Sequence, residues 1–155
     1  MKTTMQRLAF GLSFVFSTTI AAVFLFLATA LVPYWQDMSG AEVQSWFAGP
    51  FTRFSTMMVP THFLSIATLA LAVFLHRKTG QLPWLVFAFA ALLVCQGFNF
   101  TLYGAVLNPA LQSQNLPAEE ALATLDRWAV FHIIRSAAIC LCVVSLFAVM
   151  LKRAP

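Results

Sequence analysis

The chain has 155 residues, of which 61% are apolar and only 9% are charged, and its mean hydropathy is +0.84. A soluble globular domain carries roughly 25% charged residues, and a domain of this size could not hide so much apolar surface from water. The composition therefore excludes soluble, disordered, fibrous and nucleic-acid-binding proteins. It indicates a single integral membrane domain over residues 1–155, whose net charge of +4 is not gathered on one stripe.

Four long apolar stretches run through the chain, at about residues 8–32, 54–75, 82–107 and 128–151. Each is long enough to cross a bilayer as a helix, which takes roughly 20 residues. None shows the sustained alternation of a barrel strand. The sequence therefore predicts an all-α fold, an antiparallel four-helix bundle in the membrane.

The charged residues between these stretches predict the orientation of the bundle. One side carries most of the basic residues: Lys2, Arg7, Arg77, Lys78, Lys152 and Arg153. The other side carries all five acidic residues, together with Arg53 and Arg127. Because basic loops stay in the cytoplasm, we expect both termini and the turn at residues 76–81 there. The expected location is a bacterial inner membrane.

The two outer connections contain further signals. Between residues 33 and 53, the Ser39–Glu42 spacing is that of a capping box and predicts a short interfacial helix. Tyr34, Trp35 and Trp46 are expected to form an aromatic belt there. Asn108-Pro109 predicts the end of the third helix. Pro117 predicts the start of one long helix that continues to Leu151.

Few polar side chains lie inside the predicted spans, and ionisable groups there are expensive enough to indicate function. The ionisable ones are His62, His132 and Arg135, and the uncharged Gln96 and Asn99 accompany them. At about 1.5 Å per helical residue, four of these side chains lie roughly 6–12 Å from the outer end of their helices: His62, Asn99, His132 and Arg135. The outer half of the bundle is therefore expected to be its polar half.

The spacing of these residues places them on three helix faces. The faces are Ser55, His62 and Ser65 on the second helix, Gln96, Asn99 and Tyr103 on the third, and Trp128, His132 and Arg135 on the fourth. We expect the three faces to turn toward one another and to form a polar pocket that opens outward, with phenylalanine walls. Asp126 or a bound anion could pair with Arg135.

Several chemistries lack their residues in this sequence. No carboxylate lies within a predicted span, which disfavours dinuclear metal sites and proton-coupled exporters. Two histidines are fewer than the three protein ligands usual for a mononuclear metal site. Haem held by His62 and His132 stays open as an alternative cofactor, because bis-histidine ligation needs one ligand from each of two facing helices.

The fourth helix carries the pattern Arg127-Trp128, His132, Arg135, and Asn108-Pro109 stands at the end of the third. With four spans, this pattern resembles a membrane family of largely unknown function that includes the anthrone oxygenases of polyketide pathways. Ala110-Leu111-Gln112 departs from the second asparagine that often follows Asn-Pro in that family.

The resemblance implies oxidation of a phenolic anthrone by O₂ without a metal or organic cofactor. His132 is then the expected base and Arg135 the group that stabilises the substrate anion, with His62 as an alternative base. The expected substrate-binding residues are His62, Gln96, Asn99, Tyr103, Asn108 and Trp128. The expected partners are a hydrophobic small molecule and the lipid bilayer.

Other functions fit the same residues. The chain could be a non-catalytic accessory subunit or a hydrophobic-ligand-binding protein, as a homo-oligomer or within a larger membrane complex. It could also be a haem- or quinone-binding electron carrier, or a transporter of anions that bind at Arg135.

Overall fold

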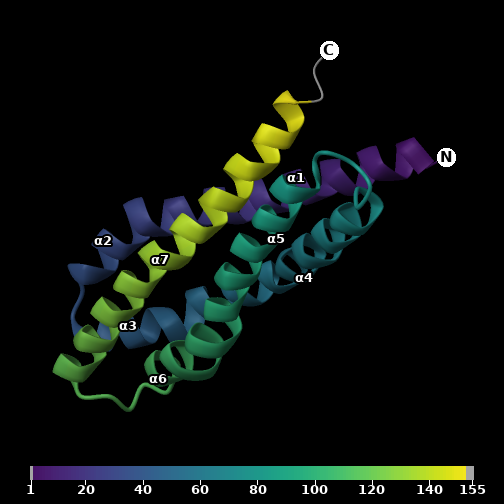
Figure 1. Cartoon of the computed structure of the whole chain (residues 1–155). Coiled ribbons are helices and arrows are strands. Elements are labelled where there is room, and N and C mark those ends of the chain that lie inside the picture. The colour runs from purple at the N-terminus through teal and green to yellow at the C-terminus, as the bar shows by residue number, and fades with distance from the viewer. Residues whose placement is uncertain (1, 153–155) are drawn as a thin grey trace.

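Figure 1 shows the computed structural model of the chain, which describes residues 2–152. Within that range the chain forms helices and turns and no strand. Four helical runs are long and apolar enough to cross a membrane, by length and composition. The all-α architecture predicted from the sequence is confirmed. The length and composition of the four runs are those of an integral membrane protein.

Three of the four runs are interrupted by π-helical stretches, labelled η. The first run consists of α1 (Lys2–Phe26), η1 (Leu27–Leu31) and α2 (Val32–Gln36). The second consists of α3 (Gly40–Trp46), η2 (Phe47–Phe51) and α4 (Thr52–Leu75), and the third of α5 (Leu82–Gly97), η3 (Phe98–Leu107) and α6 (Asn108–Gln112). The fourth is a single helix, α7 (Ala118–Leu151). This last helix begins one residue after Pro117, as the sequence predicts.

The long helices pack as an antiparallel ring. α1 contacts α4 and α7, and α5 contacts the same two helices from the other side. The start of α1, the turn between α4 and α5 and the end of α7 lie at one end of the bundle (Figure 1). Large apolar side chains also cover the outside of the ring, among them Met57, Ile133 and Val144. Such a surface suits lipid, which is as apolar as the side chains themselves.

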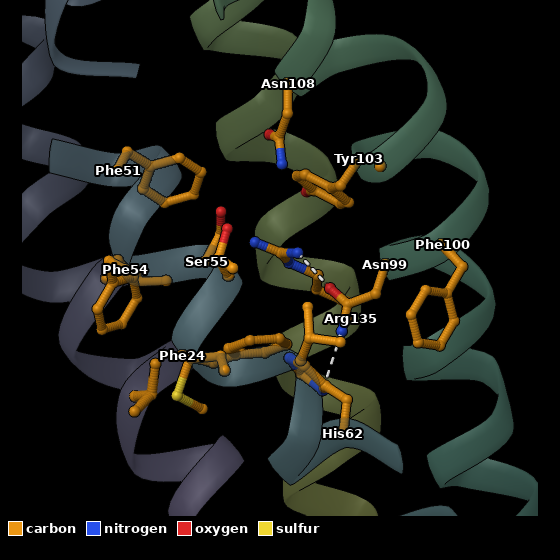
Figure 2. Close-up of a pocket in the computed structure, with 16 residues that line it drawn as sticks. Phe24, Phe51, Phe54, Ser55, His62, Asn99, Phe100, Tyr103, Asn108 and Arg135 are labelled. Carbon is orange, nitrogen blue, oxygen red and sulfur yellow. Dashed lines mark hydrogen bonds between the residues drawn. The ribbon is translucent and has the colours of Figure 1, made fainter. Parts of the chain in front are cut away.

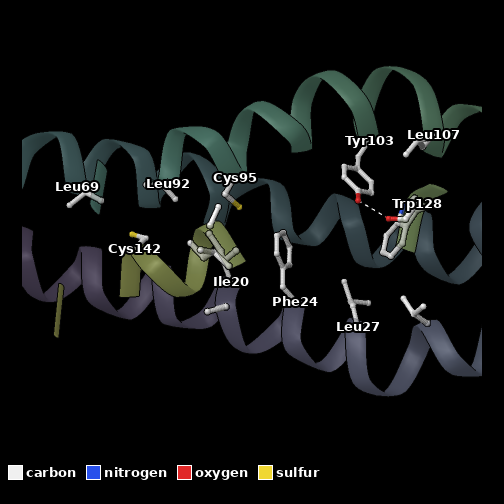
Figure 3. Packing of buried hydrophobic residues seen from close by; sticks show 14 of the residues in the cluster. Ile20, Phe24, Leu27, Leu69, Leu92, Cys95, Tyr103, Leu107, Trp128 and Cys142 are labelled. Carbon is white, nitrogen blue, oxygen red and sulfur yellow. Dashed lines mark hydrogen bonds between the residues drawn. The ribbon is translucent and has the colours of Figure 1, made fainter. Parts of the chain in front are cut away.

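The buried core changes character along the bundle (Figure 3). Toward one end it consists of aliphatic side chains such as Ile20, Leu69 and Leu92. Toward the α3 end it becomes aromatic, and Trp35, Phe47 and Trp128 are fully buried there. Trp35 touches Phe47 and Trp128 with ring centroids 5.1 and 5.6 Å apart. The prediction that Trp35 belongs to an interfacial belt is therefore wrong, because its ring is a core side chain.

Each π-helical stretch has a proline within it or just after it: Pro33 in α2, Pro50 in η2 and Pro109 in α6. Proline lacks an N–H and clashes with the carbonyl four residues earlier in a regular helix. Where the helix changes from α to π hydrogen bonding, the absent proline N–H leaves little unsatisfied. The wider π-helical turns are also frequent at functional sites. The prediction that Asn108-Pro109 ends the third helix is wrong, because the chain continues as α6 to Gln112. The proline is tolerated there because it lies in the first turn of α6, directly after the π-helical stretch.

The outer connections are shorter than the sequence suggests and are tied together. Only residues 37–39 and 113–117 are non-helical there. The capping box at the start of α3 is present, with Ser39 N donating to Glu42 Oε2 over 2.8 Å. The Gln44 side chain exchanges two 3.0 Å hydrogen bonds with the backbone of Leu116. These bonds fix α3 against the segment that leads into α7.

Gly40 lies where α3 meets the start of α7, and a Cβ there would come within 2.4 Å of the Ala118 carbonyl oxygen. Backbone cannot rotate away, so Gly40→Ala should destabilise the fold by about 1–3 kcal/mol. Gly11→Ala is the matched control, because a Cβ at Gly11 meets nothing within 4 Å and alanine favours helix. Thermal unfolding in detergent measures the difference. Equal melting temperatures for the two variants would contradict this close packing.

Candidate functional site

Arg135 of α7 is the centre of the polar half of the bundle, and only 4% of it is exposed. Its Nε donates to His132 Nδ1 over 2.9 Å, and its Nη1 donates to Asn99 Oδ1 of η3. Among residues 2–152 no carboxylate pairs with it. Asp126, the carboxylate considered from the sequence, instead accepts a bond from Gln36 Nε2 at 3.3 Å. The guanidinium is thus a buried cation held only by neutral groups.

Aromatic rings surround the remaining faces of this cation. The Arg135 Cζ atom lies 3.5 Å from the ring centroid of Tyr103, 4.5 Å from that of Phe24 and 5.0 Å from that of Trp128. A cation over an aromatic face is attracted by the negative face of the ring, and the attraction grows when water is absent. The rings therefore supply part of the stabilisation that a carboxylate would otherwise provide.

His132 lies behind the guanidinium and is fully buried. A guanidinium can only donate, so His132 Nδ1 accepts from Arg135, and its Nε2 carries the proton that is donated to the Phe24 carbonyl over 2.8 Å. The imidazole also stacks on Trp128, with centroids 4.8 Å apart. Both ring nitrogens of His132 are thus engaged with protein groups.

Asn99 extends the network toward the second helix. Since its Oδ1 accepts from Arg135, its Nδ2 faces Gln96 Oε1 at 3.1 Å and His62 Nδ1 at 3.4 Å. The second contact is long for a hydrogen bond. The polar stripes of the three helices therefore meet in one continuous network.

A cavity of about 200 Å³ lies beside this network, between α1, α4, η3 and α7 (Figure 2). An apolar cavity of about 150 Å³ can already hold benzene. Most of the lining is apolar, including Phe24, Phe51 and Phe54. The polar groups that reach it are those of Ser55, Thr56, His62, Asn99, Tyr103, Asn108 and Arg135. Apolar walls with a few convergent polar groups are typical of small-molecule sites.

The exposed part of the lining lies on the side of the bundle. Every exposed lining residue belongs to α4 or η3, namely Thr56, Val59, Phe100 and Gly104. Phe100 stacks on Phe63 of α4 with centroids 5.4 Å apart, which bridges the two helices beside the cavity. The cavity therefore opens between two helices, on a surface whose neighbouring side chains are apolar.

The residues singled out from the sequence occupy two layers. His62, Asn99, Tyr103, Asn108 and Arg135 line the cavity, whereas Gln96, Trp128 and His132 do not. The second group contacts and orients the first. Their roles in catalysis or binding stay predictions.

Sequence reasoning missed the contribution of the first helical run. Phe24 of α1 contributes its ring to Arg135 and its carbonyl to His132, and Leu27 of η1 lines the cavity. Phe24 is one of 16 phenylalanines in the chain, and no ionisable residue lies between Arg7 and the end of α1 to mark a functional face. Only the packing of α1 against α4 and α7 identifies it.

Comparison with known proteins gives one match. A family model described as anthrone oxygenase matches residues 47–145, which include α4, α5, η3 and most of α7. The matched range contains all the polar residues of the network described above. No curated protein and no solved structure matches the chain.

Variants of Tyr103 measure how much its hydrogen bond and its contact with Arg135 contribute to the free energy of unfolding. Its hydroxyl donates to the Trp128 carbonyl over 2.8 Å, while its ring faces the guanidinium. Tyr103→Phe should lower the free energy of unfolding by about 0.5–1.5 kcal/mol, because only the hydrogen bond is lost. Tyr103→Leu should lower it by about 1–2 kcal/mol more, because the cation–π contact is lost as well. Denaturant unfolding in detergent compares the two, and equal losses would contradict the cation–π contact.

Proposed function

The chain belongs to the anthrone oxygenase family, and on that premise we propose that it is a membrane-embedded oxygenase that oxidises a lipophilic phenolic substrate of the anthrone type with O₂. The balanced reaction converts the ring CH₂ of the anthrone and one O₂ into a quinone carbonyl and one water. The substrate supplies the electrons through its own carbanion, and the proposed chemistry uses no cofactor.

The observation that carries the proposal is the free edge of the Arg135 guanidinium. Two of its nitrogens donate to His132 and Asn99, and within the described chain the third donates to no side chain or carbonyl. Figure 2 shows the guanidinium directed into the cavity toward Ser55. A fixed cation in an apolar cavity stabilises a developing oxyanion far more than water does. Loss of a proton from an anthrone produces such an oxyanion, delocalised from carbon onto oxygen.

His62 is the histidine best placed to accept that proton. It lines the cavity, whereas His132 does not. Its contact from Nδ1 to Asn99 Nδ2 is 3.4 Å, too long to hold the imidazole lone pair firmly, so that lone pair is available to a ligand in the cavity. A general base must lie within hydrogen-bond reach of the proton it removes. We therefore assign the base to His62, the alternative named from the sequence.

His132 has a different role in this proposal. Its two hydrogen bonds of 2.8 and 2.9 Å to the Phe24 carbonyl and to Arg135 leave no lone pair for a substrate. It holds the guanidinium at a fixed angle and is a positioning residue. The same two bonds argue against the haem alternative, because a histidine that ligates iron needs a free ring nitrogen.

Variants of the two proposed catalytic residues test the function. Arg135→Gln should lower O₂-dependent turnover of 1,8-dihydroxyanthrone about 10²–10³-fold, because one preorganised donor to the oxyanion is lost. His62→Gln should lower it about 10²–10⁴-fold, because the general base is lost. The measurements are O₂ uptake and quinone absorbance in lipid nanodiscs. With ¹⁸O₂, one labelled atom should appear in the quinone and the other in water.

Two controls separate catalysis from spontaneous oxidation. Nanodiscs without protein give the background rate, and Val130→Ala, on the exposed surface of α7, should keep the wild-type rate. A wild-type rate equal to the background would overturn the oxygenase proposal. If the substrate still bound in that case, a hydrophobic-ligand-binding protein would be the better description.

The side opening predicts that substrate enters from lipid. Val59 lines the cavity and is 41% exposed, whereas Val106 is 54% exposed and does not line it. Val59→Trp should lower kcat/KM about tenfold for substrate supplied in the bilayer, while Val106→Trp should change it less than about twofold. Equal effects would show that substrate does not pass between α4 and η3.

A further inference from the structure

Asn108 presents a second hydrogen-bond donor to the cavity. It stands where η3 passes into α6, and its Oδ1 accepts from Trp128 Nε1 over 3.0 Å. An indole N–H can only donate, so the amide oxygen faces Trp128. The amide nitrogen therefore points into the cavity, as Figure 2 shows. Within residues 2–152 no acceptor is recorded for that nitrogen.

The orientation of the Asn108 amide is fixed by the packing of Trp128. That indole is fully buried, stacks on His132 and meets Tyr103 edge-on, with the latter centroids 5.2 Å apart. A flipped amide would place its NH₂ group against the indole N–H. The Trp128 ring thus holds the Asn108 donor toward the cavity in the same way that His132 holds Arg135.

The two donors reach the same cavity from η3 and α7. Between them lies the Tyr103 ring, whose hydroxyl proton is already donated to the Trp128 carbonyl. This wall therefore offers one charged donor at Arg135 and one neutral donor at Asn108. A ligand that leaves a buried donor unpaired loses affinity, so a site with two donors rejects a ligand that has one acceptor.

We propose that Asn108 is a specificity-determining residue that binds a second oxygen of the substrate. The anionic oxygen lies against Arg135, and a neighbouring oxygen on the same edge of the ring system accepts from Asn108. The substrate class is thereby narrowed to polycyclic phenols with at least two oxygens on adjacent positions of one edge. This inference rests on the proposed function for the anthrone class.

The experiment compares two ligands in the wild type and two variants under anaerobic conditions, where binding occurs without turnover. Anthrone has one oxygen, and 1,8-dihydroxyanthrone has three on one edge. The dissociation constants come from fluorescence titration in nanodiscs. We expect the wild type to bind 1,8-dihydroxyanthrone about tenfold more tightly than anthrone, the value of one good hydrogen bond.

Asn108→Asp keeps an oxygen for Trp128 Nε1 but replaces the donor with a carboxylate oxygen. Asn108→Leu removes both polar groups. In both variants the preference for 1,8-dihydroxyanthrone should fall below about twofold. Because the readout is a ratio of two ligands, a general loss of anion binding affects both ligands alike and cancels. The Val106→Ala variant is the control and should keep the wild-type preference, because Val106 is 54% exposed on η3 and does not line the cavity.

The outcomes separate this inference from the proposed function. A preference that persists in Asn108→Asp and Asn108→Leu would overturn the role of Asn108 while turnover of the anthrones still supports the oxygenase. A wild type that binds neither ligand would overturn both proposals together. A preference lost in both variants and kept in Val106→Ala supports the second oxygen site.

Discussion

The site depends on one physical constraint, the burial of the Arg135 cation without a carboxylate. Removing a guanidinium from water costs several kcal/mol unless other groups replace the lost hydration. Here two hydrogen-bond acceptors and the faces of three rings do so. Because these groups are neutral, the positive charge stays uncompensated and is available to an anionic ligand.

The same cation sets the direction of the hydrogen bonds made by His132 and Asn99. Arginine only donates, so His132 must accept at Nδ1 and donate at Nε2, and the Asn99 amide must turn its nitrogen toward the second helix. Trp128 imposes the matching direction on Asn108. A network whose donors are fixed in this way is preorganised, and preorganised donors stabilise a charge without rearranging when it forms.

The helix irregularities gather at this site. η1, η2 and η3 contribute Leu27, Phe51 and Asn99 to the cavity. Hydrogen bonds that span five residues widen the turn, so residues four and five apart share a face. Asn99, Tyr103 and Asn108 follow that spacing and all line the cavity. A regular α-helix would rotate Asn108 away from the face that carries Asn99.

Sequence alone determined the membrane class, the four helices, the capping box at Ser39 and the polar residues at His62, Asn99 and Arg135, because composition and charge inside an apolar span are local properties. Tertiary structure decided the rest. The π-helical turns changed the face on which Asn108 lies, and packing buried Trp35 and brought Phe24 to the guanidinium. The different surroundings of His62 and His132 also arise from contacts between helices. No pattern along one helix contains that information, because it belongs to neighbours that are distant in sequence.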